Sequence, residues 1–302
     1  MKKKIILGIV LLFSLLILWY LFVKKYDYIV TFKEKTSPGT IFHGALEWNE
    51  NLIKSDLIES KIIKEIAFSN IKQEFKIKDS TIVFNWDFEG INDSITKVTV
   101  GVIDAKNSIL NRIMLPFTSN GIKQFAINKV VSFKSGLEQH LDKHKVKFRG
   151  ISEIPEIFCA YVNVESTLEG KAQEMIANNS TVMVFLNENN IKMVGNPFIE
   201  VTSWDIVNKN IKFNYCFPVE KMNYLPKHPM VFFKQITAKK ALNTTYFGNY
   251  RTSDRAWFSV YDHALRNNIK LTNMPLEIFY NNPYMGGNEL EWRAEIFIPI
   301  EE

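Results

Sequence analysis

Two stretches of the chain, NNIKMVGNPFIEV at residues 189–201 and NNIKLTNMPLEIF at residues 267–279, are close copies of one another. In both, an Asn-Asn-Ile-Lys segment precedes a proline and a short apolar run. The two prolines, Pro197 and Pro275, are 78 positions apart. A match between two parts of one chain indicates an internal repeat, in which one structural unit is built twice.

A second matched pair extends the repeat toward the C-terminus. KFNYCFPVE and RAEIFIPIE align on Pro218 and Pro299, which are 81 positions apart. The second copy therefore carries about three extra residues between its landmarks. The Gly-rich segment NNPYMGGNELE, residues 281–291, has the composition of a turn and would hold that insertion.

Each copy has the pattern of a strand, a helix and then two strands joined as a hairpin. The first copy predicts a strand at 157–164, a helix at 171–190 and strands at 196–205 and 211–219; the second predicts a strand at 239–250, a helix at 252–268 and strands at 274–282 and 290–300. Residues 146–302, with repeats at about 153–220 and 230–302, are thus predicted to form one antiparallel sheet. Both helices would cover one face, and a groove would follow the pseudo-twofold axis on the other face.

This C-terminal domain resembles a known family. With YFGNY before the second helix, EIFYNNP in the next strand and AEIFIPI at the end, it resembles the GyrI-like or AraC-type effector-binding domain, also called the bacterial regulator effector-binding fold. The resemblance implies a small-molecule pocket with a glutamate of the last strand at its floor, and the matching residue is Glu295. Family members often follow a helix-turn-helix DNA-binding domain. The preceding part of this chain is not of that type, so direct nucleic-acid binding is not expected.

The predicted site depends on Glu295. It lies beside Phe297 in an apolar strand, and the repeat places the neutral Asn214 at its position in the first copy. Such a carboxylate either faces water or lies in a pocket, where it can bind a cation or accept a hydrogen bond. In a pocket, aromatic rings would add contacts of about 0.5–2 kcal/mol each. The candidate wall residues, each equally suited to a core, are Tyr161, Trp204, Tyr246, Tyr250, Trp257, Tyr261 and Tyr280.

These residues predict a protein that binds aromatic or cationic small molecules, while enzymatic activity stays open. In one alternative, which some GyrI-like domains suggest, Glu295 acts as a general base toward water and Tyr261 donates a proton to hydrolyse a reactive molecule. A protein-interaction module is another alternative, because some relatives bind a protein target. The sequence indicates no cofactor and no Ser-His-Asp, Cys-His or metal-binding constellation.

The chain begins with an apolar segment flanked by lysines, and residues 1–25 are predicted to be a transmembrane anchor. Residues 5–23 hold no charged side chain, and a helix of these 19 residues is long enough to cross a bilayer. The absence of a small-residue cleavage site favours an anchor over the alternative, a cleaved signal peptide. Three lysines before the segment and two after it predict a cytoplasmic N-terminus and a body on the outer, periplasmic side. The remaining chain holds 32 basic and 32 acidic residues, so its net charge does not suggest a nucleic-acid partner.

Residues 26–145 predict a different α+β domain. A strand near 28–32 leads to a helix that begins at Pro38, with Ser37 as its cap. STIVFNWDFEG and ITKVTVGVID predict antiparallel strands, and residues 119–145 predict a long final helix. This order resembles the SRPBCC family (polyketide-cyclase or START-like, helix-grip fold). In that family the final helix closes an apolar cavity over a curved sheet. The sequence is therefore compatible with either a ligand cavity or a filled core in this domain.

Histidines and cysteines have simple explanations. His140 and His144 have the spacing of a zinc-binding helix, but without an evident third ligand the sequence favours a solvated helix end. Cys159 and Cys216 lie in apolar predicted strands, which predicts buried free thiols. A disulfide stays open if the body is exported.

Overall fold

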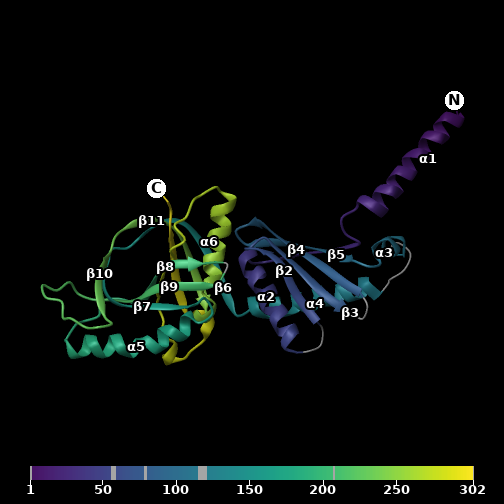
Figure 1. Cartoon of the computed structure of the whole chain (residues 1–302). Helices are drawn as coiled ribbons and strands as arrows, with labels where there is room; N and C mark the ends of the chain where they lie inside the picture. Colours follow the sequence, from purple (N-terminus) through teal and green to yellow (C-terminus); the bar gives the residue numbers. More distant parts are fainter. Residues whose placement is uncertain (1, 56–58, 78–79, 115–120, 207, 302) are drawn as a thin grey trace. The chain divides into compact units, whose positions relative to one another are not determined.

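A computed structural model of the chain describes residues 2–55, 59–77, 80–114, 121–206 and 208–301. The backbone divides into two compact units. Unit 1 comprises residues up to 35 together with 41–91 and 95–138, and unit 2 comprises residues 36–40, 92–94 and 139–302. Both contain helices and antiparallel sheet, as Figure 1 shows, so the predicted α+β class is correct.

The N-terminal helix α1 (Lys2–Leu18) continues into a π-helical segment, η1 (Trp19–Val23). Together Lys3–Val23 form a stretch of 21 residues with mean hydropathy 2.8, none of it buried by protein. Among the helices of the described residues, this one is long and apolar enough to cross a membrane. Arg112 joins its end to unit 1, because Nη1 donates to the Leu21 carbonyl and Nε to the Asp27 carboxylate, both at 2.8 Å.

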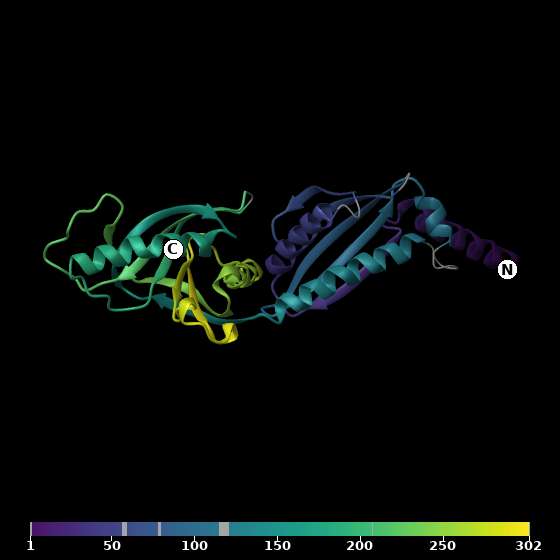
Figure 2. The ribbon, with the colours of Figure 1, turned by 90° about the horizontal axis from the view of Figure 1, so that it is seen from below.

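Unit 1 is a five-stranded antiparallel sheet in the order β1-β5-β4-β3-β2. Its elements are β1 (Tyr28–Glu34), α2 (Pro38–Lys54), β2 (Glu59–Ile66), β3 (Asn70–Ile77), β4 (Ser80–Asn92), β5 (Ile95–Asp104), α3 (Ser108–Met114) and α4 (Gly121–Leu141). Figure 2 shows α2 and α4 running along the sheet. Sequence analysis missed β2 and β3, whose many lysine and glutamate residues dilute the apolar alternation.

Aromatic rings fill the core between this sheet and its helices. The predicted strand in STIVFNWDFEG is confirmed as β4, and Phe84 and Trp86 on its inner face are fully buried. The Trp86 ring lies 5.1 Å from Phe133 of α4, and Trp48 of α2 lies 5.7 Å from the same ring. Burying large rings in this way supplies much of the hydrophobic stabilisation of such a domain.

Unit 2 is an eight-stranded antiparallel sheet in the order β10-β7-β9-β8-β12-β13-β11-β6. Its elements are β6 (His144–Ile154), β7 (Ile157–Thr167), α5 (Lys171–Glu188), β8 (Phe198–Asp205), β9 (Asn210–Pro218), β10 (Phe232–Ile236), β11 (Lys239–Gly248), α6 (Asp254–Arg266), β12 (Leu276–Phe279) and β13 (Arg293–Pro299). Outward from the central β8–β12 pair, β9 and β7 follow on one side and β13 and β11 on the other. Sequence analysis missed the edge strands β6 and β10.

The two faces of this sheet have different partners. On one face, α5 packs on β7 and β9, while α6 packs on β11, β6 and β13. The other face carries an apolar cluster that includes Phe198, Cys216 and Phe297. Because successive side chains of a strand point to opposite faces, the residues that contact the helices and the residues of this cluster lie on opposite sides of the sheet.

The predicted final helix of residues 119–145 requires a correction. It ends at Leu141, and His144 is the first residue of β6, where it pairs with Gly248 of β11. The pairing of β6 with β11 decides this boundary, because it draws the chain into the sheet of unit 2. The two histidines therefore do not share a helix face.

Candidate functional site

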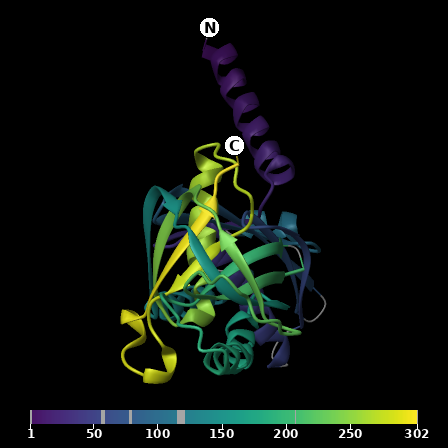
Figure 3. The same ribbon diagram turned by 90° about the vertical axis from the view of Figure 1, so that its left-hand side faces the viewer.

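A cavity of about 610 Å³ opens within unit 2, between α5, the sheet and the segment that joins β12 to β13. Figure 3 shows that segment in yellow near α5, which is seen end-on. The lining residues include three methionines, five asparagines and seven aromatic residues: Met175, Met183, Met193, Asn179, Asn196, Asn249, Asn281, Asn282, Tyr215, Phe217, Tyr250, Phe279, Tyr280, Tyr284 and Trp292. The volume is in the range of small-molecule sites, which are mostly apolar with a few polar groups.

One face of α5 forms a wall of this cavity. Ala172, Met175, Ile176, Asn179 and Met183 recur at three- and four-residue spacing, so they project from the same side of the helix. Ala172 is small, and the flexible methionine side chains can adapt their shape to what lies between helix and sheet. These five side chains together leave the space between α5 and the sheet partly open.

The sheet supplies the floor. Tyr215 and Phe217 alternate along β9, and their ring centres lie 4.7 Å apart. Phe279 projects from β12 and packs on Tyr250, with ring centres 4.8 Å apart. Burial raises the pKa of the Tyr215 hydroxyl, so this group stays a neutral hydrogen-bonding partner at physiological pH.

The segment that joins β12 to β13 builds the rim of the cavity. Residues 281–284 and Trp292 line the opening, and Gly286 and Gly287 between them have positive φ of 69° and 97°. Glycine adopts such angles without a steric penalty, which allows the tight reversal. The indole Nε1 of Trp292 donates to the Gly286 carbonyl at 3.3 Å and fixes the ring against this turn.

Tyr250 holds the rim in place from below. Its hydroxyl donates to the Arg293 carbonyl at 2.9 Å and accepts from the Asn281 backbone N–H at 3.0 Å. Burial raises its pKa to about 12, and Glu277 also contributes to the rise. Tyr250 is therefore a positioned, neutral phenol at the inner wall.

The described lining is poor in charge. Arg251, which is exposed, is its one charged residue, and no carboxylate belongs to the described residues of the wall. Five side-chain amides provide both hydrogen-bond donors and acceptors. Such a wall suits a ring-bearing molecule with neutral polar groups.

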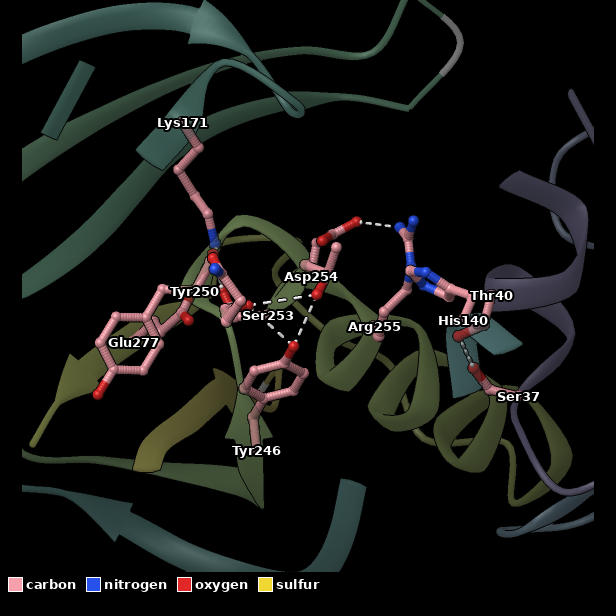
Figure 4. A network of polar contacts seen from close by, with 12 residues as sticks. Ser37, Thr40, His140, Lys171, Tyr246, Tyr250, Ser253, Asp254, Arg255 and Glu277 are labelled. Atoms are coloured by element: carbon pink, nitrogen blue, oxygen red, sulfur yellow. Dashed lines mark hydrogen bonds and ion pairs between the residues drawn. The ribbon is translucent and has the colours of Figure 1, made fainter. Parts of the chain in front are cut away.

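Beside the cavity lies an ion pair that the sequence analysis missed (Figure 4). Lys171 Nζ donates to Glu277 Oε2 at 2.9 Å and to Ser253 Oγ at 2.6 Å. Lys171, Ser253 and Glu277 have no exposed surface. The repeat offered a signal, because its alignment sets Ile199 opposite Glu277, which is as asymmetric a substitution as Asn214 opposite Glu295.

The structure places Glu295 on the other face of the sheet. It pairs with Ile278, which belongs to the apolar cluster, whereas the neighbouring Phe279 points into the cavity. The half-buried carboxylate accepts a hydrogen bond of 3.0 Å from Tyr280 Oη. Arg293 lies 3.7 Å over the Tyr280 ring. The environment of Glu295 is thus a local polar cluster, next to Tyr280 and apart from the cavity floor.

The two α6 residues among the predicted walls, Trp257 and Tyr261, both pack on Trp204 of β8. Trp257 is fully buried, and Trp204 lies 5.3 Å from it and 5.1 Å from Tyr261 between ring centres. Tyr261 donates its hydroxyl proton to Asn273, so it is not brought to Glu295. Tyr246 is fully buried and donates to the Asn249 carbonyl at 2.9 Å.

Of the predicted wall residues, Tyr250 and Tyr280 line the cavity. Tyr161 lies on the opposite face of the sheet, where Lys234 is 5.7 Å from its ring centre. That lysine also pairs with Glu200 at 2.6 Å, and Glu200 accepts from Asn214 at 2.7 Å. Asn214, which the sequence alignment sets opposite Glu295, therefore belongs to the network of the Lys234–Glu200 ion pair.

The histidines and cysteines have structural partners. His140 Nε2 accepts from Arg255 Nε at 3.4 Å, and the buried His144 stacks on Tyr246 with ring centres 5.8 Å apart. The predicted solvated helix end is wrong for His144, which is buried in a strand. Within the described residues, no cluster of three or more His, Cys, Asp or Glu side chains could hold a metal. Cys159 and Cys216 are buried free thiols, as predicted.

Comparison with known proteins gives distant likenesses only. No family model and no curated protein matches the chain. The EcmrR C-terminal domain is similar at 18% identity and a TM-score of 0.44, over 53% of this chain and 98% of that domain. EcmrR in its complex with DNA is similar at 17% identity and a TM-score of 0.44, over 66% and 73%. An integron cassette protein of Vibrio cholerae is similar at 12% identity and a TM-score of 0.31, over 52% and 99%. With TM-scores below 0.5, these likenesses carry no argument about fold or function.

Proposed function

We propose that unit 2 binds a small ring-bearing molecule in the cavity beside α5. The observation that carries this proposal is a hollow of about 610 Å³ with aromatic, methionine and amide walls. Small-molecule sites combine such apolar walls with a few polar groups that orient the ligand. The resemblance of the repeated unit to effector-binding domains supports the same function, and the symmetrical strand order agrees with a duplicated unit.

The proposal includes anchoring of the chain in a membrane by its N-terminal helix. Residues Lys3–Val23 have the length and hydropathy for one crossing. Lys2, Lys3 and Lys4 precede the segment, while two lysines follow it, which favours a cytoplasmic N-terminus and an external body. Protease added to spheroplasts, whose outer membrane is opened, would then digest the body, whereas a cytoplasmic body would be protected.

The experiment that tests ligand binding is native mass spectrometry of the full chain, purified in detergent from its natural membrane. We expect a co-purifying molecule of a few hundred daltons, since that size fills a cavity of this volume. Ile176 lines the cavity on α5, so Ile176→Trp would occupy the space and exclude the molecule. Val184→Trp, on an exposed part of the same helix, is the matched control.

The two results separate clearly. Loss of the molecule in Ile176→Trp and retention in Val184→Trp would support binding in this cavity. Retention in both variants would contradict it. The hydrolase alternative, with Glu295 and Tyr261, gains no support, because each side chain has a different partner.

A further inference from the structure

We propose that Lys171 acts as a built-in cation that neutralises Glu277, and that the cavity therefore selects uncharged rather than cationic aromatic molecules. This inference rests on the proposed function, because it names the ligand class of the same cavity. It departs from the expectation of a cationic ligand that the sequence raised. The carboxylate that matters is Glu277 rather than Glu295.

The ion pair lies against the inner wall of the cavity. Glu277 and Phe279 are two residues apart on β12, so they project from the same face of the sheet, and Phe279 lines the cavity. Lys171 directly precedes Ala172, which lines the cavity on α5. Tyr250, another lining residue, is close enough to Glu277 for that carboxylate to help raise the pKa of its hydroxyl. A charge at this position would act on anything bound in the cavity.

The ammonium group of Lys171 already occupies what would be a cation site. It contacts a carboxylate oxygen at 2.9 Å and a hydroxyl at 2.6 Å, and it lies 4.8 Å from the Trp257 ring centre. A carboxylate combined with an aromatic face is the arrangement that recognises organic cations. Here the chain supplies its own cation, so the attraction is satisfied internally.

Glu277 retains one unused oxygen. Its Oε1 is buried without a hydrogen-bond partner among the described residues, while Oε2 holds Lys171. Removal of Lys171 alone would leave the whole carboxylate uncompensated next to the cavity. Such a charge is costly when buried, and it would draw a cation from solution.

The binding test compares two probes of nearly equal shape, neutral triphenylphosphine oxide and cationic methyltriphenylphosphonium. Their Kd values are measured on the full chain in detergent for wild type, Lys171→Met and Lys171→Met/Glu277→Gln. We expect the Kd ratio to move toward the cation by about tenfold or more in Lys171→Met, since an uncompensated charge acts nearby. In the double variant, which has no charge at the pair, the ratio should return to near the wild-type value.

An unchanged ratio in Lys171→Met overturns this inference and leaves the proposed function intact, because both probes still bind. Failure of both probes to bind wild type overturns the proposed function and this inference together. Tight binding of the phosphonium to wild type, with the neutral probe excluded, overturns the neutral ligand class alone.

A second measurement covers the case in which Lys171→Met does not fold. Lys171→Ala leaves a space of the size of a three-carbon chain, and n-propylammonium chloride can restore both the missing carbon chain and its charge. We expect this salt to raise the melting temperature of Lys171→Ala by several degrees more than that of wild type, through binding to the native state. 1-Propanol is the neutral control, and equal shifts with both compounds would contradict the role of the charge.

Discussion

The α5 half and the α6 half of unit 2 have the same order of elements but opposite contents. Beside α6, the ring centres of Trp257 and Tyr261 lie 5.3 and 5.1 Å from that of Trp204, and these three rings occupy the space over the sheet. Beside α5, a cavity of about 610 Å³ remains open. The connection between β8 and β9 is short, whereas that between β12 and β13 forms the cavity rim. One backbone plan thus supports either a packed core or a binding site, depending on side-chain size and loop length.

The largest expected effect separates the two halves by stability. Trp257→Ala should lower the free energy of unfolding by about 3–5 kcal/mol, because it empties a fully buried site. Met183→Ala, on the partly exposed cavity wall, should cost less than about 1 kcal/mol. Urea unfolding of both variants measures the difference. Equal losses would show that the α5 half is packed as tightly as the α6 half.

Acid should weaken the α6 half before it weakens the α5 half. Burial, with Arg255 adding to it, lowers the pKa of His140 and of His144 from 6.5 to about 4. The unfolded chain therefore binds more protons between these values, and stability is complete above about pH 6.5. As pH falls from 6.5 toward 4, each histidine should remove up to about 1.4 kcal/mol per pH unit.

Urea unfolding at pH 7, 5.5 and 4.5 tests this pH dependence. His144→Asn keeps a polar side chain that does not titrate, so the variant should show a shallower loss than wild type over this range. A slope identical to that of wild type would assign the acid sensitivity to other groups.

Filling the cavity should leave the α5 half, like the α6 half, without space for a ligand. Ile176→Trp is expected to weaken binding of triphenylphosphine oxide by about tenfold or more, since the new indole takes the ligand's place. Its free energy of unfolding should change by no more than about 1 kcal/mol, because the position is partly exposed. Isothermal titration measures the affinity, and Val184→Trp should bind as wild type does.

The smallest effect concerns the rim. Tyr284 is 70% exposed, so Tyr284→Ala should change the free energy of unfolding by no more than about 0.5 kcal/mol. The ligand should nevertheless dissociate faster, because part of the cover is lost. Stopped-flow dissociation checks this expectation. Tyr224→Ala, at another exposed tyrosine outside the cavity lining, should leave the rate unchanged.

Local sequence patterns predicted most elements of unit 2 but not the site. The strand predicted at 211–219 is β9, yet its pattern did not tell which of its two faces a helix would leave open. The groove was expected on the face opposite the helices, and the cavity lies on the α5 face. Edge strand β6 escaped notice because HKVKFRGISEI has few apolar residues on a mostly exposed surface.

The sequence by itself determined the order strand, helix, strand, strand around α5 and again around α6, the apolar N-terminal segment and the burial of both cysteines. These features follow from periodicity and composition, which act over a few neighbouring residues. Only the tertiary structure paired Lys171 with Glu277, 106 residues later, and placed Glu295 on the sheet face opposite the cavity. Charges separated so widely in the chain meet only when helix and sheet pack, because burial and ion pairing are properties of the folded core.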